Sequence, residues 1–190
     1  MSDSLLWTEL KNGSQKALRD IYDQNMIRLE SYARKFTQDT ELIEDTIHDI
    51  FIQIWEKREG LGHTDSIIGY LCVTLRRELI RRLEKSAKTT GFEYAENKDI
   101  NFQLSAEDLI IEGEQNDLHS VKLHEAFSQL SNRQKEAIFL KFYEEMNYDE
   151  ICEAMDINYQ SVRNLISKGI IEIRKFLGTV LIAGILLLGY

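Results

Sequence analysis

The sequence predicts an all-α fold of two small helical domains joined by a flexible linker, the second a four-helix domain with a helix-turn-helix. Three observations favour it: none of the 190 residues is proline, apolar residues recur with the helical period over two separate stretches, and an acidic segment without a period divides them. A chain without proline lacks the residue that most often breaks helices. A hydrophobic content of 43% suffices for two small cores.

The N-terminal domain is expected over residues 1–88. Leu5, Leu6 and Trp7 favour a short first helix that packs onto the rest. Three amphipathic stretches of about twenty residues each then lie between residues 14 and 88, with apolar side chains three and four positions apart. Because each stretch must bury one apolar face, together they predict a three-helix bundle.

Capping residues precede these three long helices. Ser14 and Asp39 stand where the first and second begin, and their side-chain oxygens can accept backbone N–H groups of the first turn. Thr64 or Asp65 is expected to open the third helix.

Residues 89–104 predict an exposed acidic linker, because the stretch has no apolar period. The C-terminal domain is expected over residues 105–177. Ser105 and Asp108 resemble a capping box at the start of a helix that runs to Leu130. Three more helices are predicted at about 131–143, 147–155 and 158–177.

Capping signals separate the last three helices. Ser131 with Gln134 forms one capping box, Asn147 with Glu150 has similar spacing, and Asn158 precedes the final helix. Only residues 156–158 separate the last two helices. Their apolar faces are expected to pack together and hold the two helices at a steep angle. This pattern is a helix-turn-helix.

The second helix of that motif has the outward side chains of a DNA recognition helix. Its buried face leaves donors for base edges and phosphates at the positive helix end. A solvated helix in a protein-binding bundle is the alternative. The outward residues are Tyr159, Gln160, Ser161, Arg163, Asn164, Ser167 and Lys168.

Net charge is −9, which by itself argues against nucleic acid as a partner. The average hides two basic islands: residues 71–90 hold six basic and two acidic side chains, and residues 158–177 hold four and one. In the first island, side chains four positions apart make a ridge on one helix face that could follow phosphates. A solvated charged face would give the same pattern. The island contains Arg76, Arg77, Arg81, Arg82 and Lys85.

Enzyme chemistry is not expected. Cys72 and Cys152 form neither a zinc-binding spacing nor a disulfide framework, which favours a reducing cytoplasm, and the N-terminus lacks a secretory signal. Asp45 and His48 with nearby carboxylates make half of a two-metal site at most. With no nucleophile–base set and no phosphate-binding glycine loop, no cofactor, metal or small-molecule substrate is predicted.

The chain resembles the extracytoplasmic-function (ECF) class of bacterial RNA polymerase sigma factors in three runs: ELIEDTIHDIFIQIWEKRE, GYLCVTLRRELIRRL and LSNRQKEAIFLKFYEEMNYDEICEAMDINYQSVRNLISKGIIEIRKFL. The similarity covers about residues 14–88 and 121–177. It implies core RNA polymerase and promoter DNA as partners, with an anti-sigma factor as a plausible regulator. Polymerase docking is implied for Asp45, His48, Asp49, Ile52 and Trp55.

The resemblance also divides promoter recognition between the domains. The loop from Glu59 to Ser66 and the basic ridge, Arg76 to Lys85, would melt and hold the minus-ten element, a flipped base being captured in the loop. The final helix would enter the major groove of the minus-thirty-five element, where Arg163, Asn164, Ser167 and Lys168 match family contact positions.

Three residues depart from the family pattern. His48 replaces a common glutamine and Arg77 a common asparagine, so docking and minus-ten preference could differ in detail. Ser131 replaces a proline but can still cap its helix.

The predicted function is therefore a sigma factor, with a helix-turn-helix regulator that binds duplex DNA without polymerase as the alternative. Low overall charge predicts weak DNA binding by the free chain. Residues 178–190, GTVLIAGILLLGY, form an uncharged tail too short as a helix to span a bilayer. The tail is expected to pack on its own chain or on a partner, with a membrane surface as the less favoured site.

Overall fold

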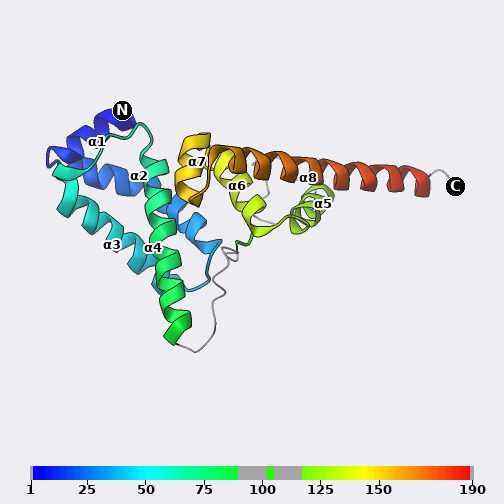
Figure 1. The fold of residues 1–190 in the computed structure, drawn as a ribbon, viewed down its shortest axis with the longest axis horizontal. Helices are drawn as coiled ribbons and strands as arrows, with labels where there is room; N and C mark the ends of the chain where they lie inside the picture. The colour runs from blue at the N-terminus through cyan, green and yellow to red at the C-terminus, as the bar shows by residue number, and fades with distance from the viewer. Residues whose placement is uncertain (1, 90–101, 105–116, 189–190) are drawn as a thin grey trace.

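A computed structural model describes residues 2–89, 102–104 and 117–188, and its elements within these ranges are helices. The N-terminal domain contains α1 (Asp3–Lys11), α2 (Gln15–Arg34), α3 (Thr40–Lys57), a 3₁₀ turn η1 (Arg58–Gly60) and α4 (Ile67–Thr89). The C-terminal domain contains α5 (Asp117–Ser128), α6 (Asn132–Phe142), α7 (Tyr148–Met155) and α8 (Tyr159–Leu188). Figure 1 shows α7 of the second domain beside α4 of the first.

The predicted caps of α2 and α3 are confirmed. Ser14 accepts the N–H of Ala17 at 3.2 Å, and Asp39 accepts the N–H of Leu42 at 3.0 Å. The predicted opening of the third long helix at Thr64 or Asp65 is wrong. Helix α4 begins at Ile67, and the Ser66 hydroxyl accepts the N–H of Gly69 at 3.1 Å, while the Thr64 hydroxyl makes its hydrogen bonds to the backbone of Ser66.

The C-terminal domain has the predicted helix-turn-helix. Both capping boxes are present at the starts of α6 and α7, and Asn158 accepts the N–H of Ser161 at 2.9 Å. Asp156 takes the left-handed conformation, with φ of 52°, and ends α7. The predicted start at Ser105 and Asp108 lies outside the described residues.

α8 is longer than predicted. It continues as helix to Leu188 instead of ending at 177, and Figure 1 shows its second half extending away from the other helices. The side chains beyond Gly178 lie outside the described residues, so the role of the tail stays a prediction. Within the described part of the chain, no helix combines the length and apolar character needed to cross a membrane.

The end of the predicted linker is not exposed. Phe102 is 0% exposed and Leu104 is also buried, while the N–H of Gln103 donates to the carbonyl oxygen of Lys35 at 2.9 Å. The large apolar side chains of Phe102 and Leu104 explain the difference. The free energy gained by removing them from water favours burial, although the sequence before them is acidic. Residues 90–101 lie outside the described residues.

Candidate nucleic-acid interface

The first half of α8 presents its predicted contact residues outward. Val162 and Ile166 are buried against the domain, and Leu165 is half-buried. Ser161 is half-buried, and the other six predicted residues are exposed: Tyr159, Gln160, Arg163, Asn164, Ser167 and Lys168.

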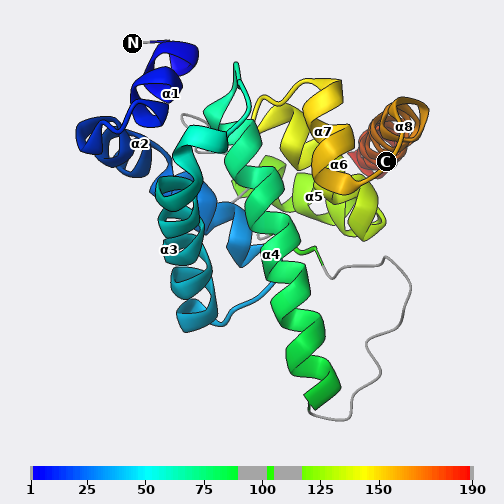
Figure 2. The same ribbon diagram turned by 60° about the vertical axis from the view of Figure 1, so that its left-hand side comes forward.

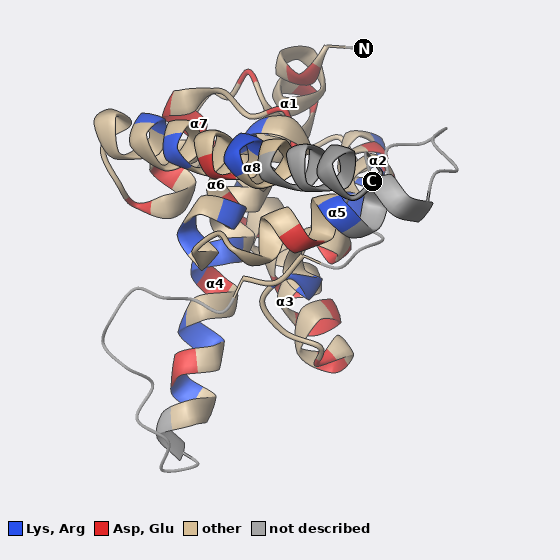
Figure 3. Ribbon diagram, turned by 90° about the vertical axis from the view of Figure 1, so that its right-hand side faces the viewer, with Lys and Arg blue, Asp and Glu red and all other residues tan. Residues whose placement is uncertain are grey.

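Charge and hydrogen bonding favour DNA contact by this helix face. Neither Arg163 nor Lys168 has an ion pair among the residues that the structure describes. The amide of Gln160 donates to the side-chain oxygen of Asn164 at 3.0 Å, which orients both amides. Figure 3 shows basic bands on α8 and on α4. Arg163 and Lys168 could therefore contact phosphates or base edges in a duplex groove, beside the oriented side-chain amides of Gln160 and Asn164.

The basic ridge of α4 is less available than its sequence suggests. Arg76 is 7% exposed and pairs with Glu136 of α6 in the other domain. Arg77 is exposed, with its guanidinium 3.8 Å from the Glu153 carboxylate of α7. In this arrangement Arg76 cannot reach DNA. Its predicted role requires the domains to separate.

Two further arginines of the ridge share one carboxylate. Arg81 donates twice to Glu78, at 2.9 and 2.6 Å, and Arg82 donates to it at 2.7 Å. The hydrogen bond from Arg81, helped by that from Arg82 and opposed by burial, lowers the pKa of Glu78 from 4.5 to about 2. Arg82 also pairs with Asp49 of α3. The ridge therefore carries less free positive charge than its arginines alone would give.

The ion pair between Asp49 and Arg82 connects two of the predicted surfaces. Asp49 belongs to the predicted polymerase-docking face of α3, and Arg82 belongs to the basic ridge of α4 that is predicted to hold the minus-ten element. Lys85 lies farther along α4 and is exposed.

The predicted docking face of α3 is largely open. Asp45 and His48 are exposed, and the Ile52 side chain is 55% exposed. Trp55 is half-buried, with the Arg58 guanidinium 4.5 Å from its ring centroid.

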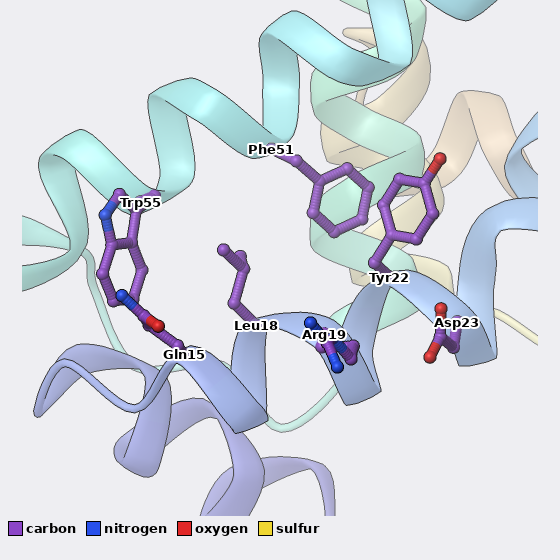
Figure 4. Close-up of a pocket in the computed structure, with 7 residues that line it drawn as sticks. All are labelled: Gln15, Leu18, Arg19, Tyr22, Asp23, Phe51 and Trp55. Carbon is purple, nitrogen blue, oxygen red and sulfur yellow. The ribbon is translucent and has the colours of Figure 1, made fainter.

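A groove of about 550 Å³ lies next to this face, between α2 and α3 (Figure 4). Tyr22 contacts Phe51 edge-on at 5.0 Å and stacks beside His48 at 6.3 Å between ring centroids. No sequence signal singles out Tyr22 or Phe51, because both fit an ordinary bundle core. The full lining consists of Gln15, Leu18, Arg19, Tyr22, Asp23, Phe51 and Trp55.

Helix α1 fixes the loop that leads into α4. Trp7 donates its indole N–H to the carbonyl oxygen of Gly62 at 2.9 Å, and Asp3 accepts the N–H of Ile67 at 2.9 Å. The hydroxyl oxygen of Ser4 lies 3.1 Å from Nε2 of His63, within hydrogen-bond distance. No local motif could have predicted these contacts, because the partners lie 55 to 64 residues apart.

Comparison with known families matches both domains. Residues 21–89 match Sigma-70 region 2, and residues 120–172 match Sigma-70, region 4, together more than half of the chain. The chain belongs to the ECF class of sigma factors. The two matched regions hold the basic ridge of α4 and the recognition helix of α8.

Similar curated proteins carry the same class name. An ECF RNA polymerase sigma factor SigK of Mycolicibacterium vanbaalenii is 23% identical over 180 residues, covering 93% of this chain and 89% of the relative. A SigK of Mycobacterium sp. (strain JLS) is 24% identical over 166 residues, covering 85% and 83%. The alternative of a regulator that works without polymerase is not favoured by these matches.

Solved structures share the fold. CnrH, solved in complex with the cytosolic domain of CnrY, matches with a TM-score of 0.59 at 14% identity over 93% of this ECF sigma factor and 97% of that chain. RpoE of Bartonella quintana, solved with the anti-sigma factor NepR, matches with a TM-score of 0.55 at 19% identity over 84% and 98%. The all-helical prediction is confirmed.

Proposed function

We propose that the two domains of this sigma factor divide promoter recognition, with α4 and its preceding loop on the minus-ten element and α8 on the minus-thirty-five element. As a sigma factor, the chain directs promoter recognition together with RNA polymerase. One observation carries the division of labour. Both matched regions are present in family order, and the second presents a helix whose exposed residues include Arg163 and Lys168, which have no ion pair among the described residues.

Polymerase docking is assigned to the exposed face of α3 and the adjoining groove. Ile52 supplies apolar surface, Asp45 and His48 surround it with polar groups, and the groove offers Trp55 and Phe51 as walls. An apolar centre within a polar rim is typical of protein interfaces. A helical element of the polymerase fits such a groove between two helices.

Regulation by an anti-sigma factor is part of the proposal. Two solved complexes of proteins with this fold support it: RpoE was solved with the anti-sigma factor NepR, and CnrH with the cytosolic domain of CnrY. The cytoplasm, where polymerase meets the genome, stays the predicted location. No enzymatic activity of its own is assigned to the chain, in keeping with the family.

Reconstituted transcription tests this function. Core polymerase is incubated with a genomic fragment library, with and without the chain, and transcript ends are sequenced. We expect new start sites that share two upstream elements and that require the chain. Start sites that do not depend on it, or stable duplex binding by a dimer without polymerase, would contradict the proposal.

A further inference from the structure

An aromatic pair lies where the two helices of the helix-turn-helix begin. Tyr148 is the first residue of α7, and Tyr159 is the first residue of α8. Their ring centroids are 5.3 Å apart, with an angle of 45° between the ring planes. Helices α7 and α8 pack against each other, and Figure 2 shows both beside α6. The ring pair therefore connects the first helix of the motif to the start of the recognition helix.

The ring of Tyr148 is held in place by the end of α6. Nζ of Lys141 lies 5.2 Å from the centroid of this ring, within the range of a cation–π contact. The same Nζ donates to the carbonyl oxygen of Met146 at 3.1 Å, so the cation is itself fixed. Tyr148 is half-buried and packs against the apolar core. Its ring therefore offers a fixed surface to Tyr159.

Tyr159 combines a fixed position with an open ring. Asn158 precedes it and accepts the N–H of Ser161 at 2.9 Å, which orders the first turn of α8. Tyr159 nevertheless stays 48% exposed. A tyrosine side chain has only two torsion angles to fix, and contact with Tyr148 restricts them before DNA binds. The exposed edge of the Tyr159 ring is therefore preorganised for a contact.

The position of Tyr159 decides what its ring can contact. Residues at the N-terminal end of a recognition helix reach base edges in the major groove. The C5-methyl group of thymine is the apolar feature of that groove, and it is read by apolar side-chain surface. Gln160, Arg163 and Asn164 are exposed on the same helix and offer hydrogen-bond donors. The Tyr159 ring offers the apolar surface that these three residues lack.

The surroundings of Tyr148 favour a supporting role for it. The next residue, Asp149, is exposed, and its carboxylate disfavours the close approach of a phosphate to the start of α7. Tyr148 is also less exposed than Tyr159. Tyr148 therefore acts on DNA through Tyr159.

We propose that Tyr159 reads the methyl group of one thymine in the minus-thirty-five element, and that Tyr148 is the residue that positions it. The inference rests on the proposed contact of α8 with that element. It adds a base contact made by apolar surface to the hydrogen-bonding residues of the same helix. Lys141 completes the arrangement by fixing the Tyr148 ring from α6.

The test uses this sigma factor bound to core polymerase, on a promoter taken from its mapped start sites. Each thymine of the minus-thirty-five element, on either strand, is replaced in turn by uracil, which removes only the methyl group. Competition binding against a labelled promoter gives the ratio of the uracil to the thymine dissociation constant at each position. For the unmodified chain we expect one thymine at which uracil weakens binding by about fourfold, the effect of losing one buried methyl contact.

Two variants of Tyr159 and one control decide whether this ring makes the contact. Tyr159→Ala should abolish the methyl dependence because it removes the apolar surface, whereas Tyr159→Phe should preserve it. Phe142→Leu removes a 56% exposed ring at the end of α6 and should also preserve it. A minus-thirty-five element at which no uracil substitution weakens binding, or a uracil penalty that persists in Tyr159→Ala, would overturn the proposal.

The positioning role of Tyr148 has its own readout. Tyr148→Leu keeps apolar volume against the core but removes the ring, so the penalty at the same thymine should fall to about twofold. Tyr148→Phe should restore the full penalty. An equal loss of affinity at every position, with an unchanged ratio at that thymine, would refute positioning. If Tyr148→Leu does not fold, the Tyr159 variants still decide whether the methyl group is read.

Mapping of start sites scores the sigma-factor function separately. If no start site depends on the chain, the proposed function fails and the inference fails with it. If start sites depend on the chain but binding is indifferent to the methyl group, only the reading of thymine by Tyr159 fails.

Discussion

The indole N–H of Trp7 donates a hydrogen bond to the carbonyl oxygen of Gly62 at 2.9 Å, across 55 residues of sequence. The same indole lies against the Tyr70 ring, with centroids 4.9 Å apart. Asp3, at the start of α1, accepts the N–H of Ile67 and so caps α4. Helix α1 thus holds the loop proposed to capture a promoter base at two points, one within the loop at Gly62 and one just after it at Ile67.

Replacing Trp7 with Phe should therefore reduce promoter opening. Phenylalanine keeps aromatic packing against Tyr70 but cannot donate to Gly62, so the loop loses one fixed point. Losing one hydrogen bond of about 1 kcal/mol predicts a roughly fivefold lower rate of open-complex formation. Permanganate footprinting of melted thymines with reconstituted polymerase measures it.

The matched control for Trp7→Phe is Thr8→Ala on the same helix. Thr8 is exposed, and its hydroxyl donates only to the carbonyl oxygen of Ser4 within α1 among the contacts described. The control should open promoters normally. Equal opening by both variants would show that α1 does not position the loop.

Substituting Ile52 with Asp should weaken binding to core polymerase by at least about tenfold, since a charge would enter the apolar centre of the proposed docking face. Folding should be unaffected because Ile52 is 55% exposed. Ile27→Asp is the control, because Ile27 is 80% exposed on α2. Co-purification with core polymerase gives the readout. Equal loss in both variants would point to general charge repulsion instead of a docking site.

Local signals predicted the elements well. Ser14, Asp39, Ser131 and Asn147 all cap the helices they precede, because a cap depends on residues only three positions apart. The buried and exposed faces of α8 likewise followed from helical spacing.

Long-range pairing could not be predicted from the sequence. Arg76 and Glu136 are 60 residues apart, and nothing in a basic ridge shows which arginine another domain will cover. Glu78, in contrast, stands within one helical turn of Arg81 and Arg82, so its shielding of the ridge was available from spacing alone. The domain packing decides which predicted DNA residues are accessible.

Glu78 should contribute to stability in a pH-dependent way. Its pKa is lowered from 4.5 to about 2 in the folded chain, mainly by Arg81. A lowered pKa stabilises the fold above pH 4.5, and this stabilisation disappears as pH falls from 4.5 to about 2. Glu78→Gln should therefore flatten the dependence of urea unfolding on pH across that window.

The same variant should bind single-stranded DNA a few-fold more tightly at neutral pH, because it frees Arg81 and Arg82. Glu84→Gln removes an exposed acid from the same helix and serves as the control. If both variants gained equally, net charge alone would explain the effect and Glu78 would have no special role.

Arg163 should read a base in the minus-thirty-five element. It is exposed on the recognition helix and has no ion pair among the described residues, so its fork of donors is available to a guanine edge. Arg163→Ala should weaken binding to the preferred duplex by about 1–3 kcal/mol and relax the base preference at one position.

Two further variants separate base reading from charge. Arg163→Lys keeps the charge but loses the forked donors, so it should also relax the base preference while the salt dependence of binding is preserved. Lys57→Ala, an exposed cation on α3, controls for charge. Competition binding with single-position promoter variants decides: a uniform loss across all variants would assign Arg163 to a phosphate instead.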